Sequence, residues 1–274
     1  MAAGELAPSS LTTAACSVLT AADPNDKVRL SRQTAAAWLD GDIADLGDST
    51  PPDRPARPSA PELRAPKDVP RRRIGSGLRG RVALLHALAH IELNAIDLAW
   101  DLIARFASDP RLPRAFYDDW VRVAAEEAEH FALLRGRMSD LDAAYGDLPA
   151  HDGLWEAAQA TAGDLLARLA VVPMVLEARG LDVTPQMIKR LRQVEDHASA
   201  DILQTIHDDE IGHVAVGRKW FEHCCRVENL DPVAAFQSLV RRYFRGQLKP
   251  PFNEASRNRA GFTPDYYEPL VQRS

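Results

Sequence analysis

The sequence predicts an all-α protein whose main body is a four-helix bundle. Beyond about residue 74, apolar residues recur with the spacing of roughly 3.6 that marks one face of a helix. Alternating runs rich in Val, Ile and Thr and bounded by hairpin turns are missing from the same region. The chain of 274 residues is 46% hydrophobic, which is enough for one large core.

The N-terminal part has a different composition and is predicted to be an extension of the bundle. We assign residues 1–73 to this extension and residues 74–274 to the bundle with its C-terminal additions. Residues 48–70 are so rich in proline that we expect an extended linker rather than a helix or central strand. One short helix is predicted around Leu30 to Leu39, in a piece that either packs on the main body or stays mobile.

Four long amphipathic helices are predicted, at about 78–107, 113–138, 154–179 and 198–225. The third is expected to kink at Pro173 and to end at Gly180. A short extra helix is expected to follow, with Thr184 as its N-cap and Pro185 at its first position. Residues 139–153 are predicted to form a long crossover between the two helix pairs. At about 3.3 Å per residue they reach far enough to run the length of a helix.

Six acidic and histidine side chains fall on the apolar faces of these helices: Glu92, Glu127, His130, Glu177, Glu210 and His213. Burying an unpaired carboxylate costs several kcal/mol, so such residues persist only with a counter-charge or a metal ion. Residues three apart on a helix project to the same side. Each Glu-x-x-His pair can therefore present an oxygen and an imidazole nitrogen to one ion.

The order of these residues repeats along the chain. Glu127 follows Glu92 by 35 residues and Glu210 follows Glu177 by 33, and each second glutamate begins a Glu-x-x-His pair. One glutamate from each of two helices and one Glu-x-x-His from each of the other two is the ligand set of a ferritin-like dimetal bundle. The competing interpretation is a buried salt-bridge network without metal.

Several stretches also resemble a known family. They include "GRVALLHALAHIELNAIDLAWDLIARF", "FYDDWVRVAAEEAEHFALL", "VVPMVLEARGLDVTP", "DEIGHVAVGRKWF" and "PPFNEASRNRAGF". The chain is similar over about residues 70–265 to the bacterial ferritin-like family catalogued as domain of unknown function 455. The resemblance implies the ferritin-like fold and the six ligand positions, and it implies no particular substrate.

More distant ferritin-like proteins suggest roles for two further acids. Many of them have an acid directly before the metal-binding glutamate, and it holds the ring of the opposite histidine. By this resemblance Asp209 orients His130 and Glu126 orients His213, unless both are ordinary surface acids. The arginine that belongs to the same pattern is absent, since Glu129 and Gly212 stand in its place.

The expected cofactor is a pair of divalent metal ions, because four carboxylates and two imidazoles suit iron or manganese, either as diiron or as a mixed pair. The leading expectation is an oxidoreductase or hydroxylase that uses O2 or peroxide on an unknown small substrate, with an unknown electron donor. The alternatives are a ferroxidase-like iron-handling protein without an organic substrate, and a scaffold with a structural metal. No dinucleotide fingerprint, Walker loop or zincin motif indicates another cofactor or another set of catalytic residues.

Composition indicates which partners and which cellular compartment to expect. A net charge of −6 and a pI near 5.8 argue against a general nucleic-acid binder. We expect no membrane segment, because no apolar run reaches about 18 residues, and "LTTAACSVLTAA" lacks the cationic start of a signal peptide. Cys16, Cys224 and Cys225 suit reduced thiols and a cytoplasmic protein. The N-terminal extension favours a monomer or dimer over a cage.

A few residues near the ligands carry weaker expectations. His86 and His90 point away from the ligand face of their helix and are predicted to pack or to form hydrogen bonds, with a second site as the alternative. His151 is expected to cap a helix or to close over one end of the bundle. Gly212 and Gly217 are predicted to leave room for a substrate beside the ligands.

Overall fold

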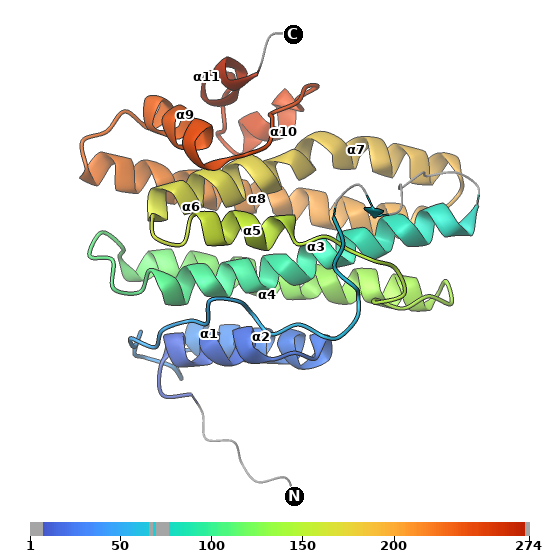
Figure 1. Cartoon of the computed structure of the whole chain (residues 1–274), viewed down its shortest axis with the longest axis horizontal. Coiled ribbons are helices and arrows are strands. Elements are labelled where there is room, and N and C mark those ends of the chain that lie inside the picture. The colour runs from blue at the N-terminus through green and yellow to red at the C-terminus, as the bar shows by residue number, and fades with distance from the viewer. Residues whose placement is uncertain (1–7, 66–67, 70–76, 272–274) are drawn as a thin grey trace, which may run out of the picture. The chain divides into compact units, whose positions relative to one another are not determined.

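Helices form almost all of the regular structure in the computed structural model, which describes residues 8–65, 68–69 and 77–271 (Figure 1). Among these residues the β interaction is limited to one isolated bridge between Leu63 and Ala150, so the all-α prediction is confirmed. The chain divides into unit 1, Met1–Ser59 with Glu92–Phe131, and unit 2, Ala60–Ile91 with Ala132–Ser274. The predicted boundary at residues 73 and 74 lies outside the described residues.

Three of the predicted long helices are present. They are α3 (Leu78–Arg105), α4 (Arg114–Ser139) and α8 (His197–Val227). Each lies within three residues of its predicted ends. Because the units divide at Glu92 and Phe131, α3 and α4 each contribute to both units.

Helix α3 is also long and apolar enough to cross a membrane by length and composition alone, which the sequence interpretation did not anticipate. However, 72% of the 18-residue apolar stretch in this helix is buried inside the structure. A buried core helix has the same composition, so this finding leaves the expected localisation untested.

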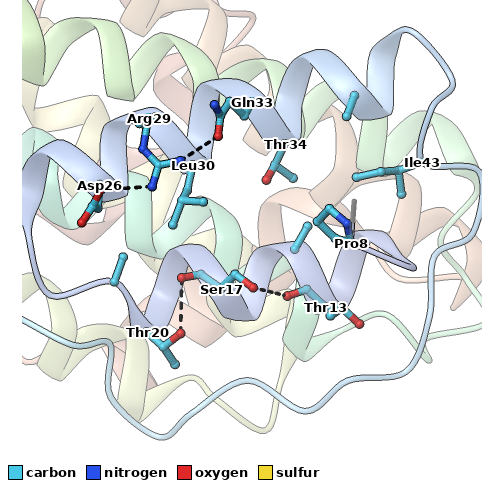
Figure 2. Close-up of a pocket in the computed structure, with 13 residues that line it drawn as sticks. Pro8, Thr13, Ser17, Thr20, Asp26, Arg29, Leu30, Gln33, Thr34 and Ile43 are labelled. Carbon is cyan, nitrogen blue, oxygen red and sulfur yellow. Dashed lines mark hydrogen bonds and ion pairs between the residues drawn. The ribbon is translucent and has the colours of Figure 1, made fainter. Parts of the chain in front are cut away.

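Unit 1 begins with two helices that lie side by side, α1 (Leu11–Thr20) and α2 (Pro24–Leu39) (Figure 1). The sequence interpretation missed α1. Ser10 caps it by accepting a hydrogen bond from the amide of Thr13, and Asp23 caps α2 ahead of Pro24. A surface groove of about 770 Å³ runs between the two helices and is lined largely by hydroxyl, charged and small side chains (Figure 2).

Within unit 1, the N-terminal extension packs on α3 through buried polar contacts. Lys27 is fully buried, and its Nζ lies 2.5 Å from Asp97 Oδ1 on α3 and 3.0 Å from the carbonyl oxygen of Val18. Arg57, from the proline-rich segment, lies 2.8 Å from the other oxygen of Asp97. Of the two outcomes left open for this extension, packing is the one observed. The proline-rich residues 48–59 belong to unit 1 and contain no helix, as predicted.

The prediction of a single helix over residues 154–179 is wrong in unit 2. The chain instead forms α5 (Gly153–Ala160), α6 (Leu165–Val171), a π-helical segment η2 (Val172–Glu177) and α7 (Ala178–Gln193). The break before α6 is fixed by Asp164, whose side chain accepts a hydrogen bond from the amide of Ala167 and so starts a new helix. The π segment begins beside Pro173, which cannot donate to the α-helical ladder.

The predicted end at Gly180 and the separate short helix with Thr184 as its N-cap are both wrong, because α7 runs through Gly180 and Pro185 without interruption. A proline inside a helix leaves the carbonyl four residues earlier without its amide donor. Here that carbonyl belongs to Leu181, and it accepts a hydrogen bond of 3.1 Å from the side-chain amide of Asn253. A contact from a distant part of the chain therefore allows α7 to continue.

The crossover between α4 and α5 is held by two histidines of α3. His86 Nε2 accepts a hydrogen bond of 3.0 Å from the amide of Gly146. The ring nitrogens of His90 lie 2.8 Å from Tyr145 Oη and 3.1 Å from the carbonyl oxygen of His151. The prediction that these two histidines form packing or hydrogen-bonding contacts is confirmed.

The C-terminal part of unit 2 comprises α9 (Pro232–Tyr243), α10 (Glu254–Arg259), α11 (Pro264–Tyr267) and a 3-10 turn (Glu268–Leu270). Helix α9 packs on α6 and α8, and α10 packs on α7 and α8. Arg257 of α10 is buried and forms two hydrogen bonds of 2.8 Å to Asp182 of α7. This charged pair fixes the C-terminal segment onto α7.

Candidate metal site

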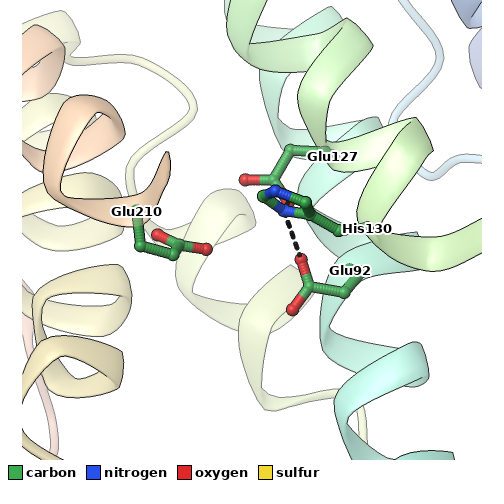
Figure 3. A group of neighbouring side chains, drawn as sticks. All are labelled: Glu92, Glu127, His130 and Glu210. Atoms are coloured by element: carbon green, nitrogen blue, oxygen red, sulfur yellow. Dashed lines mark ion pairs between the residues drawn. The ribbon is translucent and has the colours of Figure 1, made fainter. Parts of the chain in front are cut away.

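Three predicted ligands come together inside unit 1. Glu92 comes from α3, and Glu127 and His130 come from one face of α4 (Figure 3). Their exposed fractions are 3%, 0% and 1%. His130 Nδ1 lies 3.4 Å from Glu92 Oε2 and 3.5 Å from Glu127 Oε2, and one potential ligand atom of each residue lies within 4.8 Å of the others. Two carboxylates and an imidazole thus face one small buried volume.

The two carboxylates of this trio face a histidine and no lysine or arginine among the contacts of the described residues, so protons govern its charge. Burial, together with the neighbouring charge of Glu127, raises the pKa of Glu92 to about 8. Burial by itself lowers the pKa of His130, but hydrogen bonds to Glu127 and Glu92 outweigh it and raise that pKa to about 11. Without a metal, protons therefore compensate the carboxylates. A divalent cation could take over this role, because such sites bind metal by releasing protons.

The second set of predicted ligands lies in unit 2. Glu210 and His213 occupy successive turns of α8, with His213 Nδ1 3.7 Å from Glu210 Oε2. His213 is buried and Glu210 is half-buried. Glu177 is the last residue of the π segment η2, which packs against α8. A π-helical turn at this predicted ligand fits the frequent occurrence of such turns at functional sites.

Close approach of η2 to α8 requires the glycine at position 217. A Cβ at Gly217 would lie 2.4 Å from Cβ of Pro173, closer than any real contact. The predicted room for a substrate is therefore wrong at Gly217, because Pro173 fills that space. Gly212 does face open space, but it is exposed on the surface of α8 and enlarges no buried pocket.

The predicted ligands thus fall into two groups, each described within its own unit. Glu92, Glu127 and His130 meet in unit 1, and Glu210 pairs with His213 in unit 2. Their union into one dimetal centre stays a prediction. The same holds for the orienting roles of Asp209 and Glu126.

The sequence interpretation missed the buried acids Asp97, Asp101 and Asp196, of which Asp97 lies nearest in sequence to a predicted ligand. Asp97 lies on α3 five residues after Glu92 and is fully buried. It pairs with Lys27 and Arg57, so it belongs to a structural ion cluster rather than to the candidate metal site. Its position on an apolar stripe was the available signal, but that signal does not distinguish an ion-paired acid from a ligand.

Comparisons with known proteins confirm the predicted membership of the family of unknown function 455, and the ferritin-like part of the resemblance stays a prediction. Residues 20–268 match the family described as "Protein of unknown function (DUF455)", and the chain belongs to this family. An uncharacterised protein of Haemophilus influenzae is 41% identical over 254 residues, which cover 89% of this chain and 88% of the relative. No solved structure matches the chain.

Proposed function

We propose that this member of the family of unknown function 455 is a ferritin-like dimetal protein that uses O2 or peroxide to oxidise a small organic molecule. The observation that carries the proposal is the buried trio of Glu92, Glu127 and His130, in which two carboxylates share one imidazole. A structural ion network would instead place arginine or lysine against such carboxylates. Asp97 in the same unit shows that arrangement.

The donor set fits two divalent ions of iron or manganese. Carboxylate oxygens and imidazole nitrogens are the ligands these metals prefer, and four carboxylates balance the charge of two divalent ions. We assign the ligands to two groups of the same composition, each with two glutamates and one histidine. The first is Glu92, Glu127 and His130, and the second is Glu177, Glu210 and His213.

The bound metals would supply the activation of O2 or peroxide. The chain's own part is to hold the ligands in place and keep water away. His130 turns Nδ1 toward Glu92 and Glu127, and His213 turns Nδ1 toward Glu210. In each ring Nε2 is then the nitrogen left for an orienting acid, a role we propose for Asp209 and Glu126. We further propose that the protein works in the cytoplasm as a monomer or dimer.

Metal loading tests this function directly. Protein produced with added iron or manganese is expected to hold two ions per chain by elemental analysis, and Glu127→Ala is expected to remove most of the metal. Glu129→Ala is the matched control, because Glu129 lies on the same helix but is exposed and pairs with Arg32. Equal metal content in wild type, Glu127→Ala and Glu129→Ala would exclude the site.

A second measurement separates an oxidoreductase from an iron-handling protein. An oxidoreductase keeps two ions per chain and consumes O2 in step with an organic substrate. A ferroxidase-like protein oxidises Fe(II) supplied in excess and accumulates more than two Fe(III) per chain, without needing any organic substrate.

A further inference from the structure

A basic surface of unit 2 lies on the segment "RRYFRGQLK", residues 241–249, at the end of α9. Arg241, Arg242, Arg245 and Lys249 are exposed, and no acidic residue occurs between positions 241 and 253. Throughout the described part of the chain, none of these four cations takes part in an ion pair. In a protein with a net charge of −6, this is a local concentration of uncompensated positive charge.

The segment is held in a defined shape. Tyr243 Oη donates a hydrogen bond of 3.3 Å to Asp164, and the carbonyl oxygen of Lys249 accepts one of 2.8 Å from Arg179 Nη1. The ring of Phe244 covers Gly246 so closely that a Cβ there would lie 2.5 Å from the ring. A surface ordered before contact loses less entropy on binding than a flexible one, so these cations are suited to recognition.

The same contacts connect the segment to the proposed ligand Glu177. Arg179, which holds Lys249, follows Glu177 by two residues at the start of α7. The side chain of Asp182, one turn further, is fully buried and pairs with Arg179 and Arg257. It also accepts a hydrogen bond of 2.9 Å from the amide of Asn253. The C-terminal end of the basic segment is therefore anchored to α7, the helix that directly follows the predicted ligand Glu177.

We propose that this basic surface, formed by Arg241, Arg242, Arg245 and Lys249, docks an acidic protein that delivers single electrons to the proposed metal site. The proposal rests on the proposed function, because an oxygen-using dimetal site needs a reductant. Opposite charge speeds encounter and sets orientation, and arginine and aromatic residues are enriched at protein interfaces. Each reduced donor gives up one electron and is oxidised, and two donors reduce two metal ions by one electron each.

The test replaces the exposed cations and measures binding as well as electron transfer. The probe is an acidic plant-type two-iron ferredoxin, a one-electron donor. In the variant Arg241→Gln/Arg242→Gln/Arg245→Gln/Lys249→Gln, calorimetric affinity at low salt is expected to fall about tenfold or more, with a similar fall in the rate of metal reduction by ferredoxin. Wild-type binding is expected to weaken as salt is added.

A matched control removes four exposed cations elsewhere in unit 2: Lys189→Gln/Arg190→Gln/Arg192→Gln/Arg226→Gln. Its affinity for ferredoxin is expected to stay within about threefold of wild type, since only nonspecific long-range charge is lost. Equal weakening in both variants would overturn the proposal, as would a wild-type protein that does not bind ferredoxin. The proposal also fails if single-stranded oligouridylate binds the surface more tightly than ferredoxin at about 0.15 M salt, because the partner would then be a nucleic acid.

Failure of the metal site gives a different pattern. Metal content, and reduction of the metal by dithionite, report on the proposed function and do not depend on the basic surface. A protein that holds no metal but binds ferredoxin only through this surface would disprove the dimetal function and leave the docking surface standing. A protein that holds a reducible metal but binds ferredoxin equally well without the basic surface would support the dimetal function and disprove the docking surface.

Discussion

Two buried acids on the same helix have opposite surroundings. Asp97 lies 2.5 Å from Lys27 and 2.8 Å from Arg57, so two cations surround one carboxylate. Glu92, five residues earlier on α3, faces a second carboxylate and one imidazole. Both acids are almost completely buried. Burial alone therefore does not separate a structural acid from a candidate metal ligand, and the two acids differ in the balance of charge around them.

The difference has a physical consequence for each cluster. The Asp97 cluster is complete without further ions and ties the N-terminal extension to α3. The Glu92 cluster has too little positive charge, and the pKa of Glu92 rises to about 8 so that a proton compensates. One cluster therefore serves stability, and the other is suited to binding a cation.

The largest expected effect comes from breaking the first cluster. Asp97→Ala leaves the fully buried Lys27 without its carboxylate, which costs about 3 to 5 kcal/mol in free energy of unfolding. Urea unfolding of the metal-free protein measures this loss. Asp26→Ala, at an exposed position of α2, serves as control and is expected to leave stability almost unchanged. A loss below about 1 kcal/mol at Asp97 would mean that the cluster does not hold the extension in place.

A substitution in the Glu92 cluster is expected to lower metal affinity strongly and stability only a little. Glu127→Gln removes a proposed ligand and should lower metal affinity about a hundredfold. This is the upper end of the loss caused by removing a residue that only orients a metal ligand. The substitution also removes a like charge beside Glu92, so the metal-free protein should lose less than about 1 kcal/mol in free energy of unfolding. Metal content and urea unfolding of the same variant give both numbers. A strongly destabilised metal-free variant would assign Glu127 a structural role.

A pair of glycine variants extends the contrast to α8 in unit 2. Gly217→Ala places a methyl group against Pro173 and should cost about 1 to 3 kcal/mol in free energy of unfolding. Gly212→Ala meets no atom within 4 Å and is expected to stabilise the helix by up to about 1 kcal/mol. Thermal unfolding compares the two. Similar effects at both positions would contradict the close packing of η2 on α8.

The smallest expected effect is a pH dependence of metal affinity. Since the pKa of Glu92 in the metal-free protein is raised to about 8, Glu92 holds a proton below that pH, and the metal must displace it. Affinity should therefore rise up to about tenfold per pH unit toward pH 8 for each proton released. Calorimetry in two buffers of different ionisation enthalpy counts the released protons. Affinity that is independent of pH between about 6 and 8 would argue against Glu92 as a ligand.

The long helices could be predicted because their apolar faces are continuous. Helices α3, α4 and α8 each show unbroken spacing, and the glutamates on those faces identified the candidate ligands. The extent of α7 could not be predicted in the same way. Its passage through Pro185 depends on Asn253, which replaces the missing donor at Leu181 from 72 residues away.

Prediction of the candidate site from sequence was limited in the same way by tertiary contacts. Spacing within α4 predicted that Glu127 and His130 share a face, and they do. Sequence alone could not separate Glu92 from Asp97, because the partners of Asp97 are set by tertiary packing, with Lys27 lying 70 residues earlier. Neither could it show that Gly217 is filled by Pro173, since that contact depends on the local π turn.

The central claim is that the carboxylates around Glu92 and those around Glu210 serve one pair of metal ions. An anomalous-scattering map of crystals grown from iron- or manganese-loaded protein tests it most directly. We predict two strong peaks, bound by Glu92, Glu127 and His130 together with Glu177, Glu210 and His213. Loaded protein whose map shows no peak at these side chains would contradict the account.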